Sequence, residues 1–203
     1  MSYQFDLGTF GEVGAFVLDF SGAFWQLPLC HLEQKIFCPT AGLKGKRKYL
    51  AFLRAPQGSS NAPTLWCRVA ALIMRLTQAI YDPAEVNLMC YVDDPLAALR
   101  GSEQVRQINA AIMVLVWEAL GFGLAYAKGQ LGSTVTWIGG TLKCESNGVR
   151  AWVKESIITN ISDDLRRVSK QNIVSKQELN SVLGKLVHAV GLLMIMRPFL
   201  EPL

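Results

Sequence analysis

Residues 88–99 read LMCYVDDPLAAL, and this stretch decides how the rest of the sequence is interpreted. Apolar residues flank two adjacent aspartates, Asp93 and Asp94, so the pattern predicts two strands joined by a turn that carries both carboxylates. Like charges disfavour one another, and in a low-dielectric setting one carboxyl becomes neutral unless a cation lies between them. The stretch therefore raises the question whether a cation lies between the two carboxylates at the tip of a strand pair.

The composition indicates a folded protein with a substantial core. Of the 203 residues, 51% are hydrophobic and 18% are charged, which excludes wholesale disorder. The net charge of +4 is compatible with a polyanionic partner. The five cysteines form no CxxC pair, so neither a zinc site nor a disulfide framework is indicated. Because the N-terminus also lacks a signal-peptide pattern, we expect an intracellular protein, cytoplasmic or nuclear.

Apolar periodicity predicts a mixed order of elements. The long helix at 63–81 is expected to bury the stripe Leu65, Val69, Leu72, Ile73, Leu76 and Ile80. Before this helix we expect a strand at 12–19, a turn or short helix at 21–29 and a hairpin from 34–40 and 47–55. After it we expect the 88–99 hairpin, a helix at 102–120 and further strands to about 144.

Two further patterns bear on domain organisation and on membranes. The apolar segment 110–127 approaches transmembrane length, but Glu118 and Gly121 interrupt it, so a buried helix followed by a strand is favoured and no membrane association is expected. From about residue 154 the pattern is helical only, and SKQE at 175–178 is a capping box. We therefore predict a boundary near residue 150.

Asp19 ends one apolar strand, as Asp93 ends another. If these strands are neighbours, three carboxylates converge, and hard oxygen ligands of this kind suit Mg²⁺. Two such ions, held roughly 3.5–4 Å apart, clamp the attacking and leaving oxygens of a phosphoryl transfer. The alternative is that Asp19 caps the next helix and Asp93–Asp94 only form a turn.

The surrounding motifs carry a resemblance to a known family. In order they read VLDFSGAFWQLPL (17–29), APQGSSNAPTLW (55–66), YVDDPLAAL (91–99), GLAYAKGQLG (123–132) and VTWIGGTL (135–142). This series resembles the successive palm motifs of reverse transcriptases. The tail resembles the thumb entry of retrotransposon enzymes, of the tyrosine-recombinase-bearing or gypsy type.

The resemblance implies an α+β fold. Residues 1–150 would form a polymerase palm, an antiparallel sheet backed by two long helices. Only a hairpin at 31–54 would remain of the fingers, and residues 151–203 would form a small helical, thumb-like segment.

The resemblance also implies a set of site residues. Asp19, Asp93 and Asp94 would be catalytic and, with the backbone carbonyl of Phe20, would bind two Mg²⁺ ions, for which Mn²⁺ can substitute. The other implied residues are Ala23, Phe24, Gln57, Gly58 and Lys128 for the nucleotide, with Phe24 as a steric gate against the 2′-hydroxyl, and Trp137, Ile138 and Gly139 for the primer grip.

Each of these residues also has a purely structural interpretation. Phe24 is otherwise a core aromatic, Gln57–Gly58 an ordinary turn, Lys128 a solvated lysine and 137–139 a strand and turn. His31 and His188 are expected to be structural. A last set of basic residues either follows a nucleic-acid backbone or forms a solvated face: Arg166, Arg167, Lys170, Lys176, Lys185 and Arg197.

The function implied is RNA-directed DNA polymerisation, with an RNA or DNA template–primer duplex and dNTPs as partners. Two alternatives remain: a catalytically silent nucleic-acid-binding remnant, and an RNA-templated RNA polymerase, against which Phe24 argues. Compared with the family, we expect the fingers to be largely missing. The sequence also departs from the family in Ser59 and Ser60 after PQG, and in Pro95, which removes a backbone donor directly after the aspartate pair.

Overall fold

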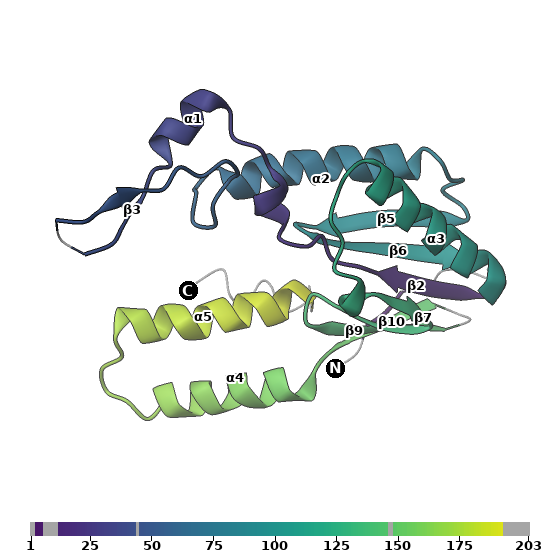
Figure 1. Cartoon of the computed structure of the whole chain (residues 1–203). Coiled ribbons are helices and arrows are strands. Elements are labelled where there is room, and N and C mark those ends of the chain that lie inside the picture. Colours follow the sequence, from purple (N-terminus) through teal and green to yellow (C-terminus); the bar gives the residue numbers. More distant parts are fainter. Residues whose placement is uncertain (1–2, 6–11, 44, 146–147, 193–203) are drawn as a thin grey trace. The chain divides into compact units, whose positions relative to one another are not determined.

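The computed structural model describes residues 3–5, 12–43, 45–145 and 148–192, and its elements are shown in Figure 1. The chain forms two compact units, one of residues 16–131 and one of residues 1–15 with 132–203. This division differs from the predicted boundary near residue 150 because the strands after residue 132 pair with one another and with the N-terminal strand. The assignment of 1–150 and 151–203 to palm and thumb stays a prediction.

The sheet of the first unit holds the 88–99 hairpin. Strands β5 (Val86–Tyr91) and β6 (Asp94–Arg100) pair antiparallel, as predicted, from Val86 opposite Leu99 to Tyr91 opposite Asp94. The sheet order is β5-β6-β2-β7, with β2 at Val13–Val17 and β7 at Gln130–Gly132. The strand that leads to Asp19 therefore lies directly beside β6.

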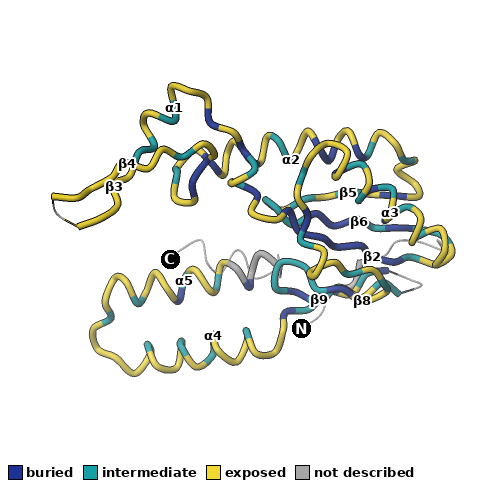
Figure 2. Tube along the Cα trace, in the orientation of Figure 1, coloured by how far each residue is buried: buried dark blue, intermediate teal, exposed yellow. Residues whose placement is uncertain are grey.

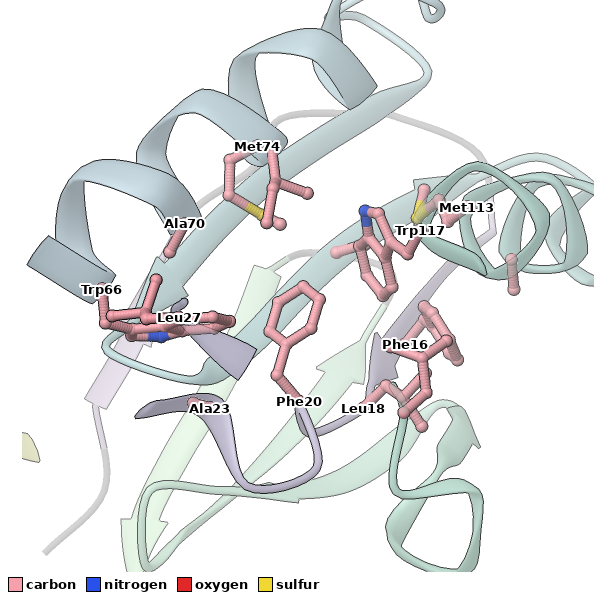
Figure 3. Close-up of a cluster of buried hydrophobic side chains, with 14 of the residues drawn as sticks. Phe16, Leu18, Phe20, Ala23, Leu27, Trp66, Ala70, Met74, Met113 and Trp117 are labelled. Atoms are coloured by element: carbon pink, nitrogen blue, oxygen red, sulfur yellow. The ribbon is translucent and has the colours of Figure 1, made fainter. Parts of the chain in front are cut away.

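Helices α2 (Ala62–Gln78) and α3 (Glu103–Ala119) pack on β5 and β6 and enclose the core. The ring of Phe20 lies at its centre, with centroids 5.4 Å from the rings of both Trp66 and Trp117 (Figure 3). Ser102 Oγ accepts a hydrogen bond from Val105 N–H at 3.4 Å, which confirms the predicted cap of α3. An antiparallel sheet backed by two long helices is thus confirmed.

The predicted buried stripe of α2 holds at Ile73, which is buried, and in part at Val69, which is half-buried against the core, and is wrong at its other four positions. Leu65, Leu72, Leu76 and Ile80 are exposed. Exposed and buried stretches alternate along α2 in Figure 2. The residues that face the core instead are Ala62, Trp66, Ala70, Ile73, Met74 and Thr77.

The polar member of this buried face is fully bonded. Thr77 Oγ1 donates to Ile73 O at 2.8 Å and accepts from Trp117 Nε1 at 2.9 Å. Small alanines let α2 approach the core closely, and a threonine hydroxyl with both bonds made costs little to bury. A prediction based only on large apolar residues therefore overlooks alanine and threonine as core-facing positions.

The segment 31–54 contains a helix that was not predicted. Helix α1 (His31–Ile36) replaces the start of the strand expected at 34–40, and the hairpin is reduced to β3 (Thr40–Ala41) and β4 (Lys48–Tyr49). Cys30 N–H donates to Glu33 Oε2 at 2.9 Å, which caps the first turn. This local cap outweighs the β propensity of the apolar residues.

The second unit has its own antiparallel sheet, in the order β1-β10-β9-β8. Its strands are β1 (Tyr3–Phe5), β8 (Thr134–Trp137), β9 (Gly140–Glu145) and β10 (Gly148–Val153). Helices α4 (Glu155–Val168) and α5 (Lys176–Leu192) follow and contact each other. Ser175 Oγ accepts from Glu178 N–H at 3.2 Å, as the predicted cap requires. Among the described helices none has the length and apolarity needed to cross a membrane.

Candidate active site

The predicted meeting of the two strand ends is confirmed by backbone hydrogen bonds. Phe20 N–H donates to Asp93 O at 3.1 Å, and Leu18 N–H donates to Pro95 O at 3.5 Å. The segment that carries Asp19 therefore runs alongside the segment that carries Asp93 and Asp94. Pro95, although it lacks a donor, keeps the acceptor that this pairing uses, and its side chain is fully buried.

The two aspartates occupy different positions at the turn. Asp94 is the first residue of β6 and faces Tyr91, so Val92 and Asp93 alone form the loop. Val92 has a φ of +57°, in the left-handed region that β-branched residues rarely adopt. A backbone held in this way costs about 1–3 kcal/mol and persists only where its surroundings enforce it. The strain lies directly before Asp93.

The electrostatics of the site reflect carboxylates held close together. Burial raises the pKa of Asp93, and the charge of Asp19 raises it further. The pKa of Asp94 is also raised, first by burial and then by the charges of Asp93 and Asp19. Burial and neighbouring carboxylate charge thus make Asp93 and Asp94 harder to ionise.

Lys128 supplies the positive charge among the described residues of this cluster. It ends the short helix η2 (Tyr126–Lys128), and its Nζ bonds to Asp19 Oδ2, which raises the pKa of Lys128. Ala125 N–H donates to Asp19 O at 2.8 Å and so holds this loop against the aspartate segment. The side chain of Asp19 is 11% exposed and that of Lys128 is 70% exposed, so a largely buried carboxylate is paired with a largely exposed lysine.

The donor chemistry of the site fits a hard divalent cation. Carboxylate oxygens are the ligands that Mg²⁺ prefers, and burial, followed by the charges of neighbouring carboxylates, raises the pKa of both Asp93 and Asp94. In the part of the chain that the structure describes, no three acidic, histidine or cysteine side chains are already arranged around a common metal position. Asp19 is instead bonded to Lys128 through its Oδ2, so a cation that binds at this oxygen competes with the ammonium.

The segment expected to hold the nucleotide sugar forms the short helix η1 (Ala23–Gln26) directly after Asp19. Ala23 is buried, and Phe24 is half-buried against the core. Both interpretations of Phe24, gate and core residue, therefore remain open.

Gln26 anchors η1 and was not singled out from the sequence. Its Nε2 donates to Ser21 O at 2.7 Å and to Gly123 O at 3.0 Å, while its Oε1 accepts from Gly123 N–H at 2.9 Å. The amide thus ties η1 to the loop that leads to Lys128. No local pattern could reveal this, because the partners are 97 residues apart.

Gln57 and Gly58 lie in an exposed turn before α2, where Ser59 N–H donates to Pro56 O at 3.2 Å. Gly58 has a φ of +93°, and an added Cβ would meet nothing within 4 Å, so glycine is required by the backbone conformation rather than by crowding. A nucleotide contact of these residues stays a prediction.

Trp137, Ile138 and Gly139 lie in the second unit, at the turn between β8 and β9. Trp137 faces Gly140, and both Ile138 (φ +41°) and Gly139 (φ +82°) have positive φ values, as in a tight type I′ hairpin. This agrees with the strand and turn expected from the sequence, and the primer-grip role stays a prediction.

Several basic residues of the helical tail are engaged in ion pairs. Asp164 binds Lys185 at 2.6 Å and Arg167 at 3.0 Å, and these contacts, the first above all, lower the pKa of Asp164. Arg166 lies 3.7 Å from Asp163. These three cations therefore contribute to α4 and α5 themselves. His31 is exposed at the start of α1, while Arg197 and the side chain of His188 lie outside the described residues.

Comparison with known proteins identifies the family. The family model described as reverse transcriptase (RNA-dependent DNA polymerase) matches residues 11–142. The Gag-Pol polyprotein of baboon endogenous virus (strain M7) is 34% identical over 129 residues, which are 61% of this chain and 7% of the polyprotein. The Pol polyprotein of feline endogenous virus ECE1 is 40% identical over 87 residues, 40% of this chain and 8% of that polyprotein.

Among solved structures, the protease–reverse transcriptase of prototype foamy virus (CSH mutant) aligns with a TM-score of 0.46 and 20% identity, over 60% of this chain and 15% of that one. The chain thus spans under a tenth of the two polyproteins named above. The family match covers well over half of the residues and contains Asp19, Asp93, Asp94 and Lys128. The chain belongs to the reverse transcriptase (RNA-dependent DNA polymerase) family.

Proposed function

We propose that this chain carries the catalytic palm of an RNA-directed DNA polymerase, which adds dNTPs to a primer 3′-hydroxyl by two-metal phosphoryl transfer. The observation that supports this most directly is the hydrogen bond from Phe20 N–H to Asp93 O, which sets two acid-bearing strand ends side by side inside the family match. In this proposal residues 1–150 form the palm, with a fingers hairpin at 31–54. Residues 151–203 form a thumb-like segment.

Asp19, Asp93 and Asp94, with the backbone carbonyl of Phe20, are the groups that would hold two Mg²⁺ ions, or Mn²⁺ in their place. Such ions, when bound, lower the pKa of a coordinated hydroxyl and neutralise charge on the leaving pyrophosphate. The chain's own part is to present the carboxylates on neighbouring segments that backbone hydrogen bonds hold together. Burial of these groups strengthens every charge interaction that they make.

The first experiment is primer extension with the purified chain on RNA and DNA templates, with and without Mg²⁺. We expect Mg²⁺-dependent incorporation of dNTPs. The ion pair between Lys128 and Asp19 favours a second candidate, a nucleic-acid-binding protein without turnover, because it occupies a carboxylate that a metal needs. Salt-sensitive duplex binding with no incorporation at any Mg²⁺ or Mn²⁺ concentration would support that candidate.

Lys128→Gln is expected to tighten the binding of Mn²⁺ to the free protein. The substitution removes the cation that competes for Asp19 and leaves the carboxylates without their bonded ammonium. At the same time the KM for dNTP should rise, because a positive charge that faces the triphosphate is lost. Mn²⁺ affinity is measured by the paramagnetic relaxation of water.

A suitable control is Lys48→Gln, an exposed lysine on β4. It removes the same charge without contact to Asp19. Equal changes in both variants, or weaker Mn²⁺ binding by Lys128→Gln, would contradict the competition.

Phe24→Val is expected to increase the incorporation of ribonucleotides by about tenfold to a hundredfold relative to dNTPs, which corresponds to roughly 1–3 kcal/mol for a lost pocket contact. A half-buried ring against the sugar would exclude the 2′-hydroxyl, and valine leaves room for it. The neighbouring Trp25→Val, at an exposed ring, serves as the control. Unchanged discrimination with a lowered denaturation midpoint would show that Phe24 is only a core residue.

A further inference from the structure

Trp66 makes a contact with the aspartate turn, although neither the motifs nor the family match gives this residue a role. Its side chain is fully buried on α2, and its Nε1–H donates to the backbone carbonyl of Val92 at 2.8 Å. The same carbonyl accepts from Cys90 Sγ at 3.4 Å. Two side chains from different elements therefore hold one peptide group, the peptide that joins Val92 to Asp93.

This peptide directly follows the strained φ angle of Val92. Val92 has a φ of +57°, a conformation in which a β-branched side chain crowds its own backbone. Relaxation of Val92 to a negative φ would rotate the Val92–Asp93 peptide and with it the start of Asp93. A hydrogen bond to the carbonyl of that peptide opposes this rotation, because the rotated oxygen no longer points at the indole.

The position of the indole is itself well determined. The Trp66 ring meets the ring of Phe20 edge-on, with centroids 5.4 Å apart, and Figure 3 shows both rings among the buried side chains between α2 and the segment after β2. Phe20 N–H in turn donates to Asp93 O. Asp93 is therefore bracketed by contacts on both sides, from Trp66 at the preceding peptide and from Phe20 at its own carbonyl.

We propose that Trp66 is a positioning residue of the active site: its indole N–H holds the Val92–Asp93 peptide in its strained conformation and so sets the direction of the Asp93 carboxylate. This inference rests on the proposed function for its catalytic consequence. The positioning itself is a property of the metal-free chain and can be measured without turnover.

Trp66→Phe is the deciding substitution, because it keeps an aromatic ring and removes only the N–H and the outer part of the indole. Trp117→Phe is a closely matched control. Trp117 is equally buried, lies in the same core, and donates its Nε1–H to Thr77 Oγ1 at 2.9 Å, away from the turn. Both variants should lower the denaturation midpoint. Only Trp66→Phe should reduce kcat. We expect a loss of about tenfold to a hundredfold, the range for a small misplacement of a catalytic group. The KM for template–primer should stay unchanged.

A second substitution tests the link to strain. Asparagine and glycine adopt positive φ more readily than valine, so Val92→Asn or Val92→Gly should need the indole less. We expect Trp66→Phe/Val92→Asn to recover most of the kcat that Trp66→Phe loses. An equal loss of kcat in Trp66→Phe and Trp117→Phe, an unchanged kcat in Trp66→Phe, or the absence of rescue would overturn the proposal.

The metal-free protein provides a readout independent of activity. In ¹⁵N NMR spectra, the backbone amide of Asp93 should shift and exchange faster in Trp66→Phe and should be unchanged in Trp117→Phe. In the unsubstituted protein, the indole proton of Trp66 should exchange far more slowly than that of Trp25, which is 40% exposed. Exchange as fast as that of Trp25 would refute the contact even if Trp66→Phe does not fold. A wild-type chain that shows the protected indole but no primer extension would contradict the proposed function and leave the positioning intact.

Discussion

Replacing Asp93 by asparagine is expected to abolish primer extension and, in the absence of divalent cations, to stabilise the protein at pH 7. The loss of activity should exceed about a hundredfold, since removal of one preorganised electrostatic contact already costs 10²–10³ in rate. Asparagine keeps the size of the side chain and the backbone acceptor for Phe20 N–H. Extension that survives the substitution would contradict the two-metal mechanism at this site.

The gain in stability follows from the direction of the pKa shift. The pKa of Asp93 in the folded protein lies above its ordinary value of 3.8, chiefly because of burial and then because of the charge of Asp19. Its stabilising contribution is therefore complete only below that ordinary value and is lost as the pH rises through the folded-state pKa. At pH 7 the ionised group opposes folding, whereas asparagine does not.

Thermal unfolding between pH 3 and pH 7 in EDTA checks this expectation. The Tm of Asp93→Asn should exceed that of the wild type at pH 7, and the difference should disappear near pH 3. Asp163→Asn serves as the control, because its exposed pair with Arg166 at 3.7 Å contributes little. A Tm of Asp93→Asn at or below the wild-type value at pH 7 would show that burial and the charge of Asp19 do not destabilise the ionised Asp93 in the folded state.

Phe20→Ala is expected to lower the free energy of unfolding by about 3–5 kcal/mol, the usual cost of removing a large buried aromatic side chain. Phe20 is 1% exposed, and its ring contacts those of Trp66, Trp117 and Phe122, so no neighbour can close the cavity without leaving another contact. Denaturant unfolding monitored by circular dichroism measures the change.

The matched control for Phe20→Ala is Trp25→Ala. This larger aromatic side chain lies five residues further on, is 40% exposed, and contacts Phe52 with ring centroids 5.6 Å apart. Trp25→Ala should lower the free energy of unfolding much less than Phe20→Ala does, because a large part of the Trp25 side chain stays in contact with water in the folded protein. Equal shifts of the two midpoints would show that the cluster around Phe20 is not the core of this unit.

Much of the fold was predictable because its signals are local. The apolar runs on both sides of Asp93–Asp94 could pair as a hairpin with both carboxylates at its tip, and Ser102 and Gly121 marked the ends of α3. The run that ends at Asp19 indicated the neighbouring strand, and the backbone bond between Phe20 and Asp93 confirms that placement. Strand periodicity and caps act over a few residues, so they can be read directly from the sequence.

The buried face of α2 could not be predicted in the same way. Apolar periodicity ranked four leucine and isoleucine positions above the alanines and Thr77 that actually face the core. The choice depends on how closely two long helices approach one sheet and on Trp117, which supplies a hydrogen-bond partner to Thr77 from 40 residues away. Neither condition is visible within the helix itself.

By itself, the sequence of this protein determined the acid-bearing hairpin, the strand that ends at Asp19 and the motif order that places the chain in its family. Only the tertiary structure decided what surrounds those acids: Lys128 bonded to Asp19 from 109 residues away, Gln26 bonded to the backbone of Gly123, and the indole of Trp66 on the carbonyl of Val92. The physical reason is the distance along the sequence over which each kind of interaction acts. Patterns of strands and caps arise from neighbouring residues, whereas hydrogen bonds and charge pairs between distant segments exist only after the core has brought those segments together.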